Sequence, residues 1–351
     1  MMILKDWVKI NFLKDKKTAE DEAKHIKTLI ESYLYPDRFT MPLTLQFELT
    51  SHCNVHCKHC YNVSGENNSK PDPMTPEKWK DFSRYIVNHG GIFQCIISGG
   101  EPLLLGDDLF EIMDILHDDG TAFLVISNCL LMTREKAKRF TKYRYKWFQV
   151  SIDGVTSERH DTFRQRQGSW DAAVKAVFML SNNGIPVTVA HTVTPENLNE
   201  VDSMCSLAYE LGASGIILGE VMPSGRSWLN PEILMNREQR NILNELITLN
   251  VQKYSGRMSV QRSSGTKIQL MRGMNTPTSG AIIRPNGDIR LDCVAPFVIG
   301  NVIDNDFYEV WNSKAHDAWK RSEVLEYINS WENEDEINHG LKNYFDSDVR
   351  L

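Results

Sequence analysis

Residues 51–62 of the chain, SHCNVHCKHCYN, contain three cysteines and three histidines within a dozen positions. Cys53, Cys57 and Cys60 have the spacing C-x3-C-x2-C, and thiols this dense on a polar segment indicate metal ligands rather than packing residues. A structural zinc ion needs four ligands, so one of the neighbouring histidines would have to take part. A [4Fe–4S] cube can be held by three thiolates from one loop, which leaves one iron open for an outside ligand. The spacing favours the cube, with zinc as the alternative.

The cysteine spacing resembles the signature of the radical S-adenosylmethionine (SAM) superfamily. The resemblance implies that Cys53, Cys57 and Cys60 hold one [4Fe–4S] cluster, whose open iron chelates the amino and carboxylate groups of SAM. One electron from the cluster would then cleave SAM to methionine and a 5′-deoxyadenosyl radical, which abstracts hydrogen from a substrate. His59 stands where relatives usually have an aromatic residue, and is similar to the histidine of peptide- and sulfatase-maturing members.

A second motif, SGGEP at residues 98–102, is similar to the GGEP motif of the same superfamily. Adjacent glycines allow a backbone to approach a ligand closely, and Glu101 supplies a negative partner for an ammonium group. The resemblance therefore implies that Gly99, Gly100, Glu101 and Pro102 bind the amino group of SAM.

Three polar residues match further positions of the superfamily. Ser151 and Asp153, in the sequence SIDG, resemble the polar residues that lie near the ribose of SAM. Asn128 occupies the place of a Thr-Asn or Ser-Asn pair. Helix capping and turn formation are the alternative explanations for these residue types.

Two more contacts to SAM are implied by the resemblance. Arg164 resembles the arginine that meets the SAM carboxylate, a task that suits the paired donors of a guanidinium, with Arg166 as its rival. Leu218 lies in the sixth-strand region where related enzymes pack the adenine, and it is the expected adenine contact.

These motifs need a scaffold, and the sequence from residue 44 onward predicts one. Short apolar, β-branched runs alternate with amphipathic segments of helical length. The predicted strands are 44–50, 93–99, 122–128, 147–153, 186–193 and 215–222, and the predicted helices are 75–90, 107–120, 133–143, 169–184 and 197–212. Six βα units imply parallel strands, fewer than the eight that close a complete barrel. We expect an α/β fold with a partial (β/α)6 TIM-like barrel, and a doubly wound sheet as the second choice.

The scaffold explains why the motifs would meet. Functional residues of parallel α/β folds gather at the carboxyl ends of the strands. The cysteine segment follows the first predicted strand, and SGGEP, SNC, SIDG and HTVT end the next four. One rim of the barrel would collect them all.

The alternating pattern stops near residue 254, which suggests a boundary. We expect an N-terminal helical segment over 1–43, the radical SAM barrel over 44–254, and a small α+β extension over 255–351. In the extension, AIIRPNGDIRL (281–291) predicts a hairpin with a two-residue Asn-Gly turn. Residues 282–312 resemble the SPASM/twitch extension, which holds one or two auxiliary [4Fe–4S] clusters in relatives. Only Cys293 stands there as a ligand, and one thiolate cannot hold a cube, so this extension is expected to lack its cluster.

Loss of auxiliary clusters makes redox-neutral chemistry more natural than a two-electron oxidation. We expect a maturase of a ribosomally synthesised peptide (RiPP biosynthesis), with epimerisation as one outcome. Cys293 is then the leading catalytic thiol, returning a hydrogen to the substrate, although a cysteine remaining in the core of the extension would look the same. The alternatives are a radical SAM epimerase, dehydrogenase or dehydratase that acts on a small molecule such as an aminosugar or nucleoside, and a silent scaffold with a structural cluster.

The composition and charge of the chain restrict the classes of partner and the cellular location that we expect. The 351 residues carry a net charge of −7 and no concentrated basic face, which argues against nucleic acid. No stretch approaches the roughly 20 apolar residues of a membrane span, and the first residues lack a signal-peptide pattern. Seven cysteines without an export signal favour reduced thiols and a cytoplasmic location. The family resemblance implies an electron donor such as flavodoxin or ferredoxin. Leader-peptide recognition would come from a separate protein or from a cap formed by residues 1–43.

Overall fold

The computed structural model describes residues 38–66, 69–330 and 348–351. The helical segment expected over 1–43 lies outside the described residues up to position 37. In the described part of the chain, no helix is long and apolar enough to cross a membrane.

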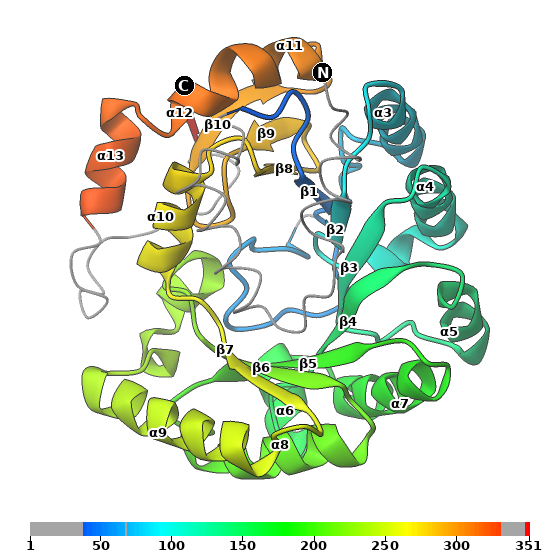
Figure 1. Cartoon of the computed structure of the whole chain (residues 1–351). Coiled ribbons are helices and arrows are strands. Elements are labelled where there is room, and N and C mark those ends of the chain that lie inside the picture. Colours follow the sequence, from blue (N-terminus) through cyan, green and yellow to red (C-terminus); the bar gives the residue numbers. More distant parts are fainter. Residues whose placement is uncertain (1–37, 67–68, 331–347) are drawn as a thin grey trace.

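Six parallel strands form the centre of the molecule, as the sequence predicted (Figure 1). They are β1 (Thr44–Glu48), β2 (Gln94–Ser98), β3 (Ala122–Ser127), β4 (Tyr145–Ser151), β5 (Val187–Val193) and β6 (Gly215–Glu220). They are neighbours in sequence order, and every adjacent pair is parallel. The α/β class and the partial barrel are confirmed.

Two further strands lengthen the parallel series beyond the expected six. The strand β7 (Ser259–Arg262) pairs with β6, and β8 (Gly280–Ile283) pairs with β1 on the opposite edge. The parallel pattern therefore does not stop at residue 254. Among the described residues β7 and β8 do not pair with each other, so the barrel stays open between them. The boundary near residue 255 remains a prediction, because one sheet runs through both parts.

Helices cover the outside of the barrel. They are α3 (Pro76–Asn88), α4 (Asp107–Asp118), α5 (Arg134–Phe140), α7 (Ser169–Asn182), α8 (Val201–Glu210) and α9 (Arg237–Lys253). The short helix α6 (Ser157–Arg164) lies instead at the rim, against the loop that follows β1. In α3, Trp79, Phe82 and Ile86 share one face because of their three- and four-residue spacing, and all three are buried. The ring of Phe47, on the outer face of β1, lies 4.9 Å from that of Trp79. Burial of each such side chain stabilises the fold by roughly 1.5–3 kcal/mol, which fixes β1 against α3.

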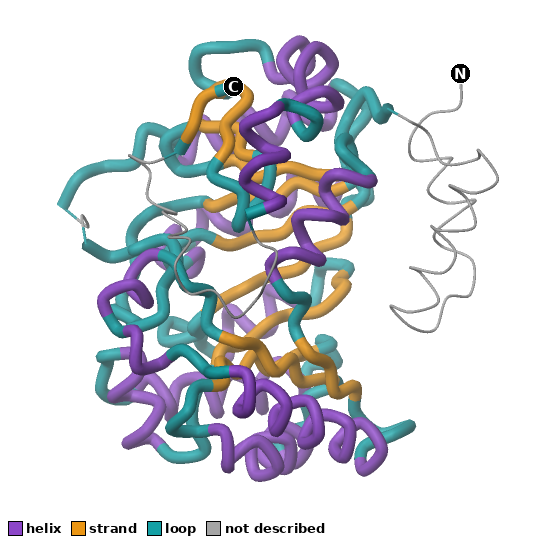
Figure 2. The backbone as a smooth tube through the Cα atoms, turned by 90° about the vertical axis from the view of Figure 1, so that its left-hand side faces the viewer, coloured by secondary structure: helices purple, strands orange, loops and turns teal. Residues whose placement is uncertain are grey.

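The extension continues the same sheet. It contains α10 (Thr266–Asn275), β9 (Asp288–Arg290), β10 (Phe297–Asn301), α11 (Phe307–Val310), α12 (His316–Ala318), α13 (Ser322–Asn329) and β11 (Val349–Arg350). The sheet order is β11-β10-β9-β8-β1-β2-β3-β4-β5-β6-β7. Figure 2 shows these strands as one continuous series with helices around it.

The expected hairpin joins β8 and β9, but its turn differs from the prediction. The N–H of Gly287 donates to the carbonyl of Arg284, so Pro285 and Asn286 are the central residues of the turn. Pro285 fixes φ near the value that the first central position needs, and Gly287 follows with φ +88°. Asn-Gly is thus not a two-residue turn here, because the preceding proline shifts the turn by one residue.

Candidate functional site

The three cysteines lie together on the loop that follows β1. Cys53 and Cys57 are buried and pack with Val55, while Cys60 and Leu130 lie against them. The backbone N–H of Cys60 donates to the carbonyl of Cys57 over 3.2 Å, which curls the loop between these two cysteines.

The loop fits a group that carries several positive charges. Burial raises the pKa of Cys53 to about 12 and that of Cys57 to about 11, and nearby thiolate charges add to both increases. Three thiolates in this position repel one another unless a metal group compensates their charge. Among residues 38–66, 69–330 and 348–351, no three His, Cys, Asp or Glu side chains converge on one point as ligands of a single ion. A cube spreads its thiolates over separate irons, so the loop can hold the cluster that the spacing predicted.

The GGEP turn packs directly against this loop. The N–H of Gly100 donates to the carbonyl of Thr50 over 2.6 Å, and the N–H of Glu101 to that of His52 over 2.9 Å. Gly99 has φ +131°, and a Cβ on Gly100 would overlap the carbonyl oxygen of His52. The glycines are therefore required by the contact between two backbones, whatever else they bind.

The Glu101 side chain is fully buried and already accepts three hydrogen bonds. Its Oε1 accepts from the N–H of Leu103 (3.0 Å) and the hydroxyl of Ser127 (2.7 Å), and its Oε2 accepts from the N–H of Asn128 (2.8 Å). Burial raises the pKa of Glu101, and these donors oppose that rise. Glu101 thus joins the ends of β2 and β3. Pro102 opens the short helix that follows, where its missing N–H leaves no bond unmade.

Asn128 connects the end of β3 to the cysteine loop. Its Nδ2 donates to Oδ1 of Asn54 (2.8 Å) and lies 3.9 Å from Sγ of Cys53. Cys129, the next residue, has φ +60°, a conformation that non-glycine residues adopt at a cost.

Asp153 and Arg164 form a buried ion pair beside Cys57. Both Nε and Nη2 of Arg164 lie 2.7 Å from Oδ2 of Asp153, and the backbone N–H of Thr192 donates to its Oδ1. Despite burial, the Arg164 charge holds the pKa of Asp153 well below its usual range. Arg164 Nη1 lies 3.7 Å from Sγ of Cys57. Arg166 is exposed, so Arg164 is the arginine of the two that reaches the loop.

His59 and Ser151 lie at the same rim. The ring of His59 stacks on Phe163 of α6, with 4.8 Å between centroids, and burial lowers its pKa to about 4. Ser151 is the last residue of β4 and pairs with Ala190. His59 therefore connects the cysteine loop to α6, and Ser151 lies at the carboxyl end of β4.

Leu218 is placed differently from the expectation. It is fully buried in the core. Its two neighbours in the strand, Ile217 and Gly219, face the other way and line a cavity of about 310 Å³. Side chains alternate along a strand, so Leu218 points toward the helices. A contact to a ligand in this cavity would fall to Ile217 or Gly219.

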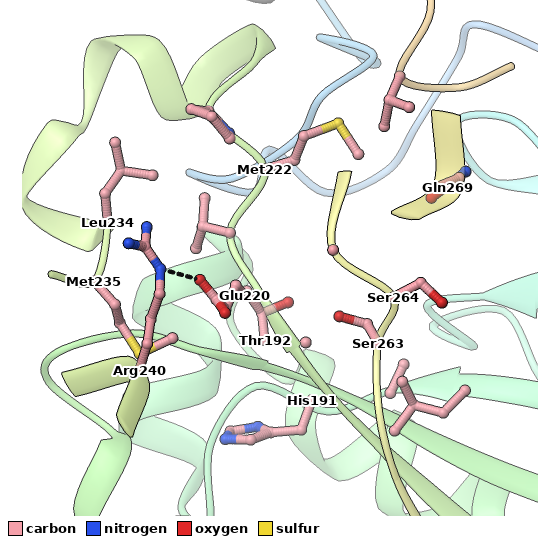
Figure 3. A pocket seen from close by; sticks show the side chains of 17 residues that line it. His191, Thr192, Glu220, Met222, Leu234, Met235, Arg240, Ser263, Ser264 and Gln269 are labelled. Carbon is pink, nitrogen blue, oxygen red and sulfur yellow. Dashed lines mark hydrogen bonds and ion pairs between the residues drawn. The ribbon is translucent and has the colours of Figure 1, made fainter. Parts of the chain in front are cut away.

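That cavity lies at the carboxyl ends of β5 and β6 (Figure 3). Met222, Leu234 and Met235 contribute apolar walls, and Arg240 forms an ion pair with Glu220 over 2.6 Å. An apolar cavity with a few fixed polar groups is typical of sites for small ligands.

Cys293 lines a second cavity of about 490 Å³. The same cavity is lined by inward-facing residues of the first four strands, namely Gln46, Ile96, Leu124 and Gln149. Nε2 of Gln269 lies 3.1 Å from Sγ of Cys293, and Gln269 lines both cavities. Burial raises the pKa of the Cys293 thiol well above its ordinary value, so the thiol is protonated at neutral pH. Cys95, Cys129 and Cys205 are buried in the core.

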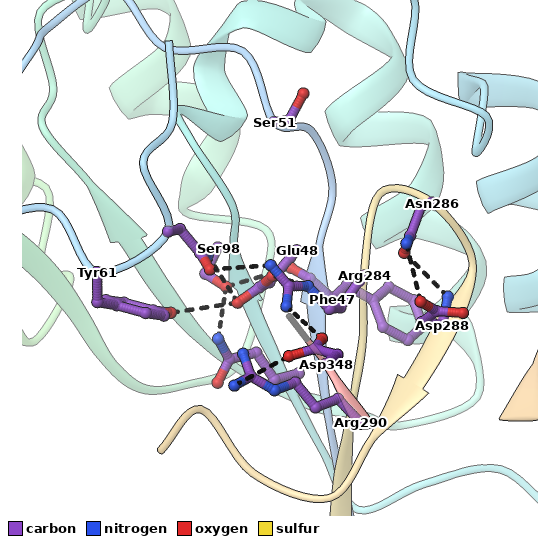
Figure 4. Close-up of polar contacts among 12 residues, drawn as sticks. Phe47, Glu48, Ser51, Tyr61, Ser98, Arg284, Asn286, Asp288, Arg290 and Asp348 are labelled. Carbon is purple, nitrogen blue, oxygen red and sulfur yellow. Dashed lines mark hydrogen bonds and ion pairs between the residues drawn. The ribbon is translucent and has the colours of Figure 1, made fainter. Parts of the chain in front are cut away.

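Two groups of residues at this site were not foreseen. Arg226, just after β6, donates to carbonyls of the cysteine loop. Glu48, the last residue of β1, accepts from Tyr61 (3.2 Å) and pairs with the fully buried Arg284 of the extension (3.5 Å; Figure 4). The signal for Glu48 was a charged residue inside an apolar strand, since a buried charge needs a buried partner.

Comparison with known proteins places the chain. The family model "Radical SAM superfamily" matches residues 47–208, and the model "Iron-sulfur cluster-binding domain", named SPASM, matches residues 275–333. The mycofactocin maturase MftC of Mycolicibacterium smegmatis is 30% identical over 285 residues, which cover 77% of this chain and 70% of that protein. The chain belongs to the radical SAM superfamily.

Other relatives agree with this assignment. The antilisterial bacteriocin subtilosin biosynthesis protein AlbA of Bacillus subtilis is 27% identical over 336 residues, 90% of this radical SAM protein and 70% of AlbA. An AdoMet-dependent heme synthase of Methanosarcina barkeri is 32% identical over 193 residues, 55% of this chain and 54% of that protein. The crystal structure of Streptococcus suis SuiB bound to S-adenosylmethionine has the same fold, with a TM-score of 0.66 at 14% identity over 93% of this chain and 83% of SuiB.

The protein is therefore an enzyme that uses SAM and a [4Fe–4S] cluster. The cluster-binding match covers a stretch in which the sequence contains one cysteine, Cys293.

Proposed function

We propose that this radical SAM enzyme modifies a ribosomally synthesised peptide by a redox-neutral exchange of hydrogen at carbon, such as epimerisation. Support for a peptide substrate comes from the relatives, whose names include a mycofactocin maturase, a bacteriocin biosynthesis protein and the sporulation killing factor maturation protein SkfB. SuiB, which shares the fold, has been solved with a precursor peptide.

In this proposal, one group of residues at the rim binds the cluster and a second group binds SAM. Cys53, Cys57 and Cys60 hold the single cluster. The surrounding residues bind SAM or shape its site, and they are His59, Gly99, Gly100, Glu101, Pro102, Asn128, Ser151, Asp153 and Arg164. When bound, the cluster and SAM supply one electron and a 5′-deoxyadenosyl radical that takes a hydrogen atom from a substrate carbon.

The observation that carries the redox-neutral outcome is the position of Cys293 in the barrel cavity. A protonated thiol can return a hydrogen atom: the S–H bond breaks, a C–H bond forms on the substrate, and a thiyl radical remains on Cys293. One electron and one proton from the reductant restore the thiol. Each turnover then consumes one SAM and two electrons, while the substrate gains and loses one hydrogen atom. Return from the opposite face would invert the carbon.

A small-molecule substrate is the second candidate, and one observation favours it. The heme synthase is 32% identical to this chain over 193 residues, and its name points to chemistry on a small molecule. Either substrate class requires an electron donor such as flavodoxin or ferredoxin. A peptide substrate adds the option of a separate leader-peptide-binding protein.

The test first identifies a substrate by screening short peptides encoded near the gene, and then follows its turnover in D2O by mass spectrometry. We expect one solvent deuteron at the modified carbon with the wild-type enzyme, and none with Cys293→Ala, which should still form 5′-deoxyadenosine. Full deuterium incorporation by Cys293→Ala would refute the role of the thiol.

A control separates this role from the cofactor sites. With SAM and a strong reductant alone, the wild-type enzyme should form 5′-deoxyadenosine slowly, and the triple Cys53, Cys57 and Cys60 alanine variant should form none and bind no cluster. Cluster binding by the triple variant would refute the assignment of the loop.

A further inference from the structure

Arg226 holds the cysteine loop from a distant part of the chain. It is 5% exposed and lies on the short helix Gly225–Leu229 that follows β6. Its Nε donates to the carbonyl of Cys57 over 2.9 Å, and its Nη1 donates to the carbonyl of Ser64 over 3.0 Å. Its own backbone N–H donates to the carbonyl of Cys60 over 2.9 Å. One residue therefore binds three loop carbonyls, two of which belong to predicted iron ligands.

The residues on either side of Arg226 support the same contact. Gly225 has φ +60°, and a Cβ at this position would overlap the carbonyl oxygens of Cys60 and Tyr61. Asn230, one turn further on, donates from Nδ2 to the carbonyl of Lys58 over 3.3 Å. The segment after β6 thus follows the backbone of the loop closely, and only glycine permits that approach.

Arg226 also places a cation beside the loop. Its Nη1 lies 3.5 Å from Oε1 of Glu66, whose side chain is 45% exposed, so water screens this pair. Arg164 supplies a second buried guanidinium near Cys57. Buried positive charge stabilises added negative charge, and reduction of a cluster adds one electron.

We propose that Arg226 is a positioning residue for the cluster, which keeps the segment from Cys57 to Ser64 in the shape that lets Cys57 and Cys60 bind iron together with Cys53. This inference rests on the proposed ligand assignment. Lysine at this position would retain the charge but not the paired donors, because only a guanidinium presents them in a rigid fork.

The experiment compares Arg226→Gln and Arg226→Lys with the wild type and with Arg139→Gln, which changes an arginine on α5. After anaerobic reconstitution, we measure iron and sulfide per chain, the rate of cluster loss to a chelator, and the midpoint reduction potential of the cluster. The amide of a glutamine can still donate to the Cys57 carbonyl in place of Nε, but it is too short to reach the Ser64 carbonyl that Nη1 binds. Arg226→Gln therefore leaves one buried carbonyl without its donor and removes the charge, so it should lose the cluster about tenfold faster than the wild type. The midpoint reduction potential of its cluster should be lower than that of the wild type. Arg226→Lys should have the wild-type potential but should still lose the cluster faster than the wild type.

Each outcome decides the proposal. The proposal would be overturned if Arg226→Gln lost the cluster at the wild-type rate. If Arg226→Gln fails to fold, the proposal would be overturned by an Arg226→Lys variant that loses the cluster at the wild-type rate. A general folding defect would lower the thermal unfolding temperature of the cluster-free variants. Such a defect would not leave Arg226→Lys with a wild-type reduction potential and a fast loss of the cluster. Cluster binding by the triple cysteine variant would instead refute the ligand assignment, which keeps the two failures distinct.

Discussion

Replacement of Arg284 by methionine tests how the extension is attached to the barrel. Arg284 is fully buried in the turn after β8 and lies 3.5 Å from Oε2 of Glu48, 2.7 Å from Oδ2 of Asp348 and 3.3 Å from Oδ1 of Asn62 (Figure 4). Methionine fills much of the space of the arginine stem but leaves the two buried carboxylates without this cation.

The expected loss of stability follows from what each carboxylate keeps. Glu48 retains the hydrogen bonds from Tyr61 and Asn62, and Asp348 retains Arg290 at 3.4 Å. Removing one partner of a buried ion pair costs about 3–5 kcal/mol. Because both carboxylates keep some partners, we expect the lower end, about 3 kcal/mol at neutral pH.

The cost should depend on pH in a stated direction. Burial raises the pKa of Asp348 in the folded protein. Loss of the Arg284 charge raises it further, so protonation relieves the variant at low pH. The difference in stability between the wild type and Arg284→Met should therefore shrink as pH falls from 7 toward 5.

The assay is urea unfolding of the cluster-free protein, followed by the fluorescence of buried tryptophans such as Trp79 and Trp311. Arg350→Met is the matched control, because Arg350 pairs with Asp288 (2.9 Å) but is 64% exposed. Such an exposed pair is worth about 1 kcal/mol at most. A loss below 1 kcal/mol for Arg284→Met, or one independent of pH, would refute the reasoning.

Two further predictions concern the rim. Glu101→Gln places an amide N–H₂ against at least one of the three donors that now point at the carboxylate. In equilibrium dialysis, SAM should therefore bind more weakly to Glu101→Gln than to the control Glu111→Gln, which lies on the surface of α4. Equal affinity of the two variants would show that Glu101 does not shape the SAM site. His160 accepts the backbone N–H of Asp153, and burial lowers its pKa to about 4. Between pH 6.5 and 4, the imidazole of His160 is protonated in the unfolded state but stays neutral in the folded state. The cluster-free wild type should therefore lose stability as pH falls through this range, by up to about 1.4 kcal/mol per pH unit from this group. His160→Gln should flatten that slope in urea unfolding, and an unchanged slope would contradict the assignment.

The strands that carry the site could be predicted because their sequences are locally distinctive. Each of the six central strands is an apolar, β-branched run, and the structure places all six within a few residues of the prediction. The cysteine loop, the GGEP turn, Asn128 and Asp153 follow these strands, so parallel pairing alone brings them to one rim.

The rest depends on contacts that the local sequence does not encode. The strand β7, with the sequence SVQR, has three exposed residues of four and no apolar run. Leu218 lies in GIILGE, where consecutive apolar residues hide which side chains face the barrel. Arg226 reaches loop carbonyls more than 160 positions earlier in the chain, and nothing near it in the sequence indicates those partners.

The pairing of β8 with β1 has a consequence for how the protein is made. Thr44–Phe47, next to the cysteine loop, pair on one side with β2 and on the other with Gly280–Ile283. During synthesis at roughly 5–20 residues per second, β1 therefore remains an unprotected edge strand for on the order of ten to fifty seconds after it leaves the ribosome. Exposed edges attract other strands, and exposed thiols react with oxidants. A chaperone or carrier protein that covers β1 until residues 280–283 are made would therefore protect both the strand edge and the neighbouring thiols.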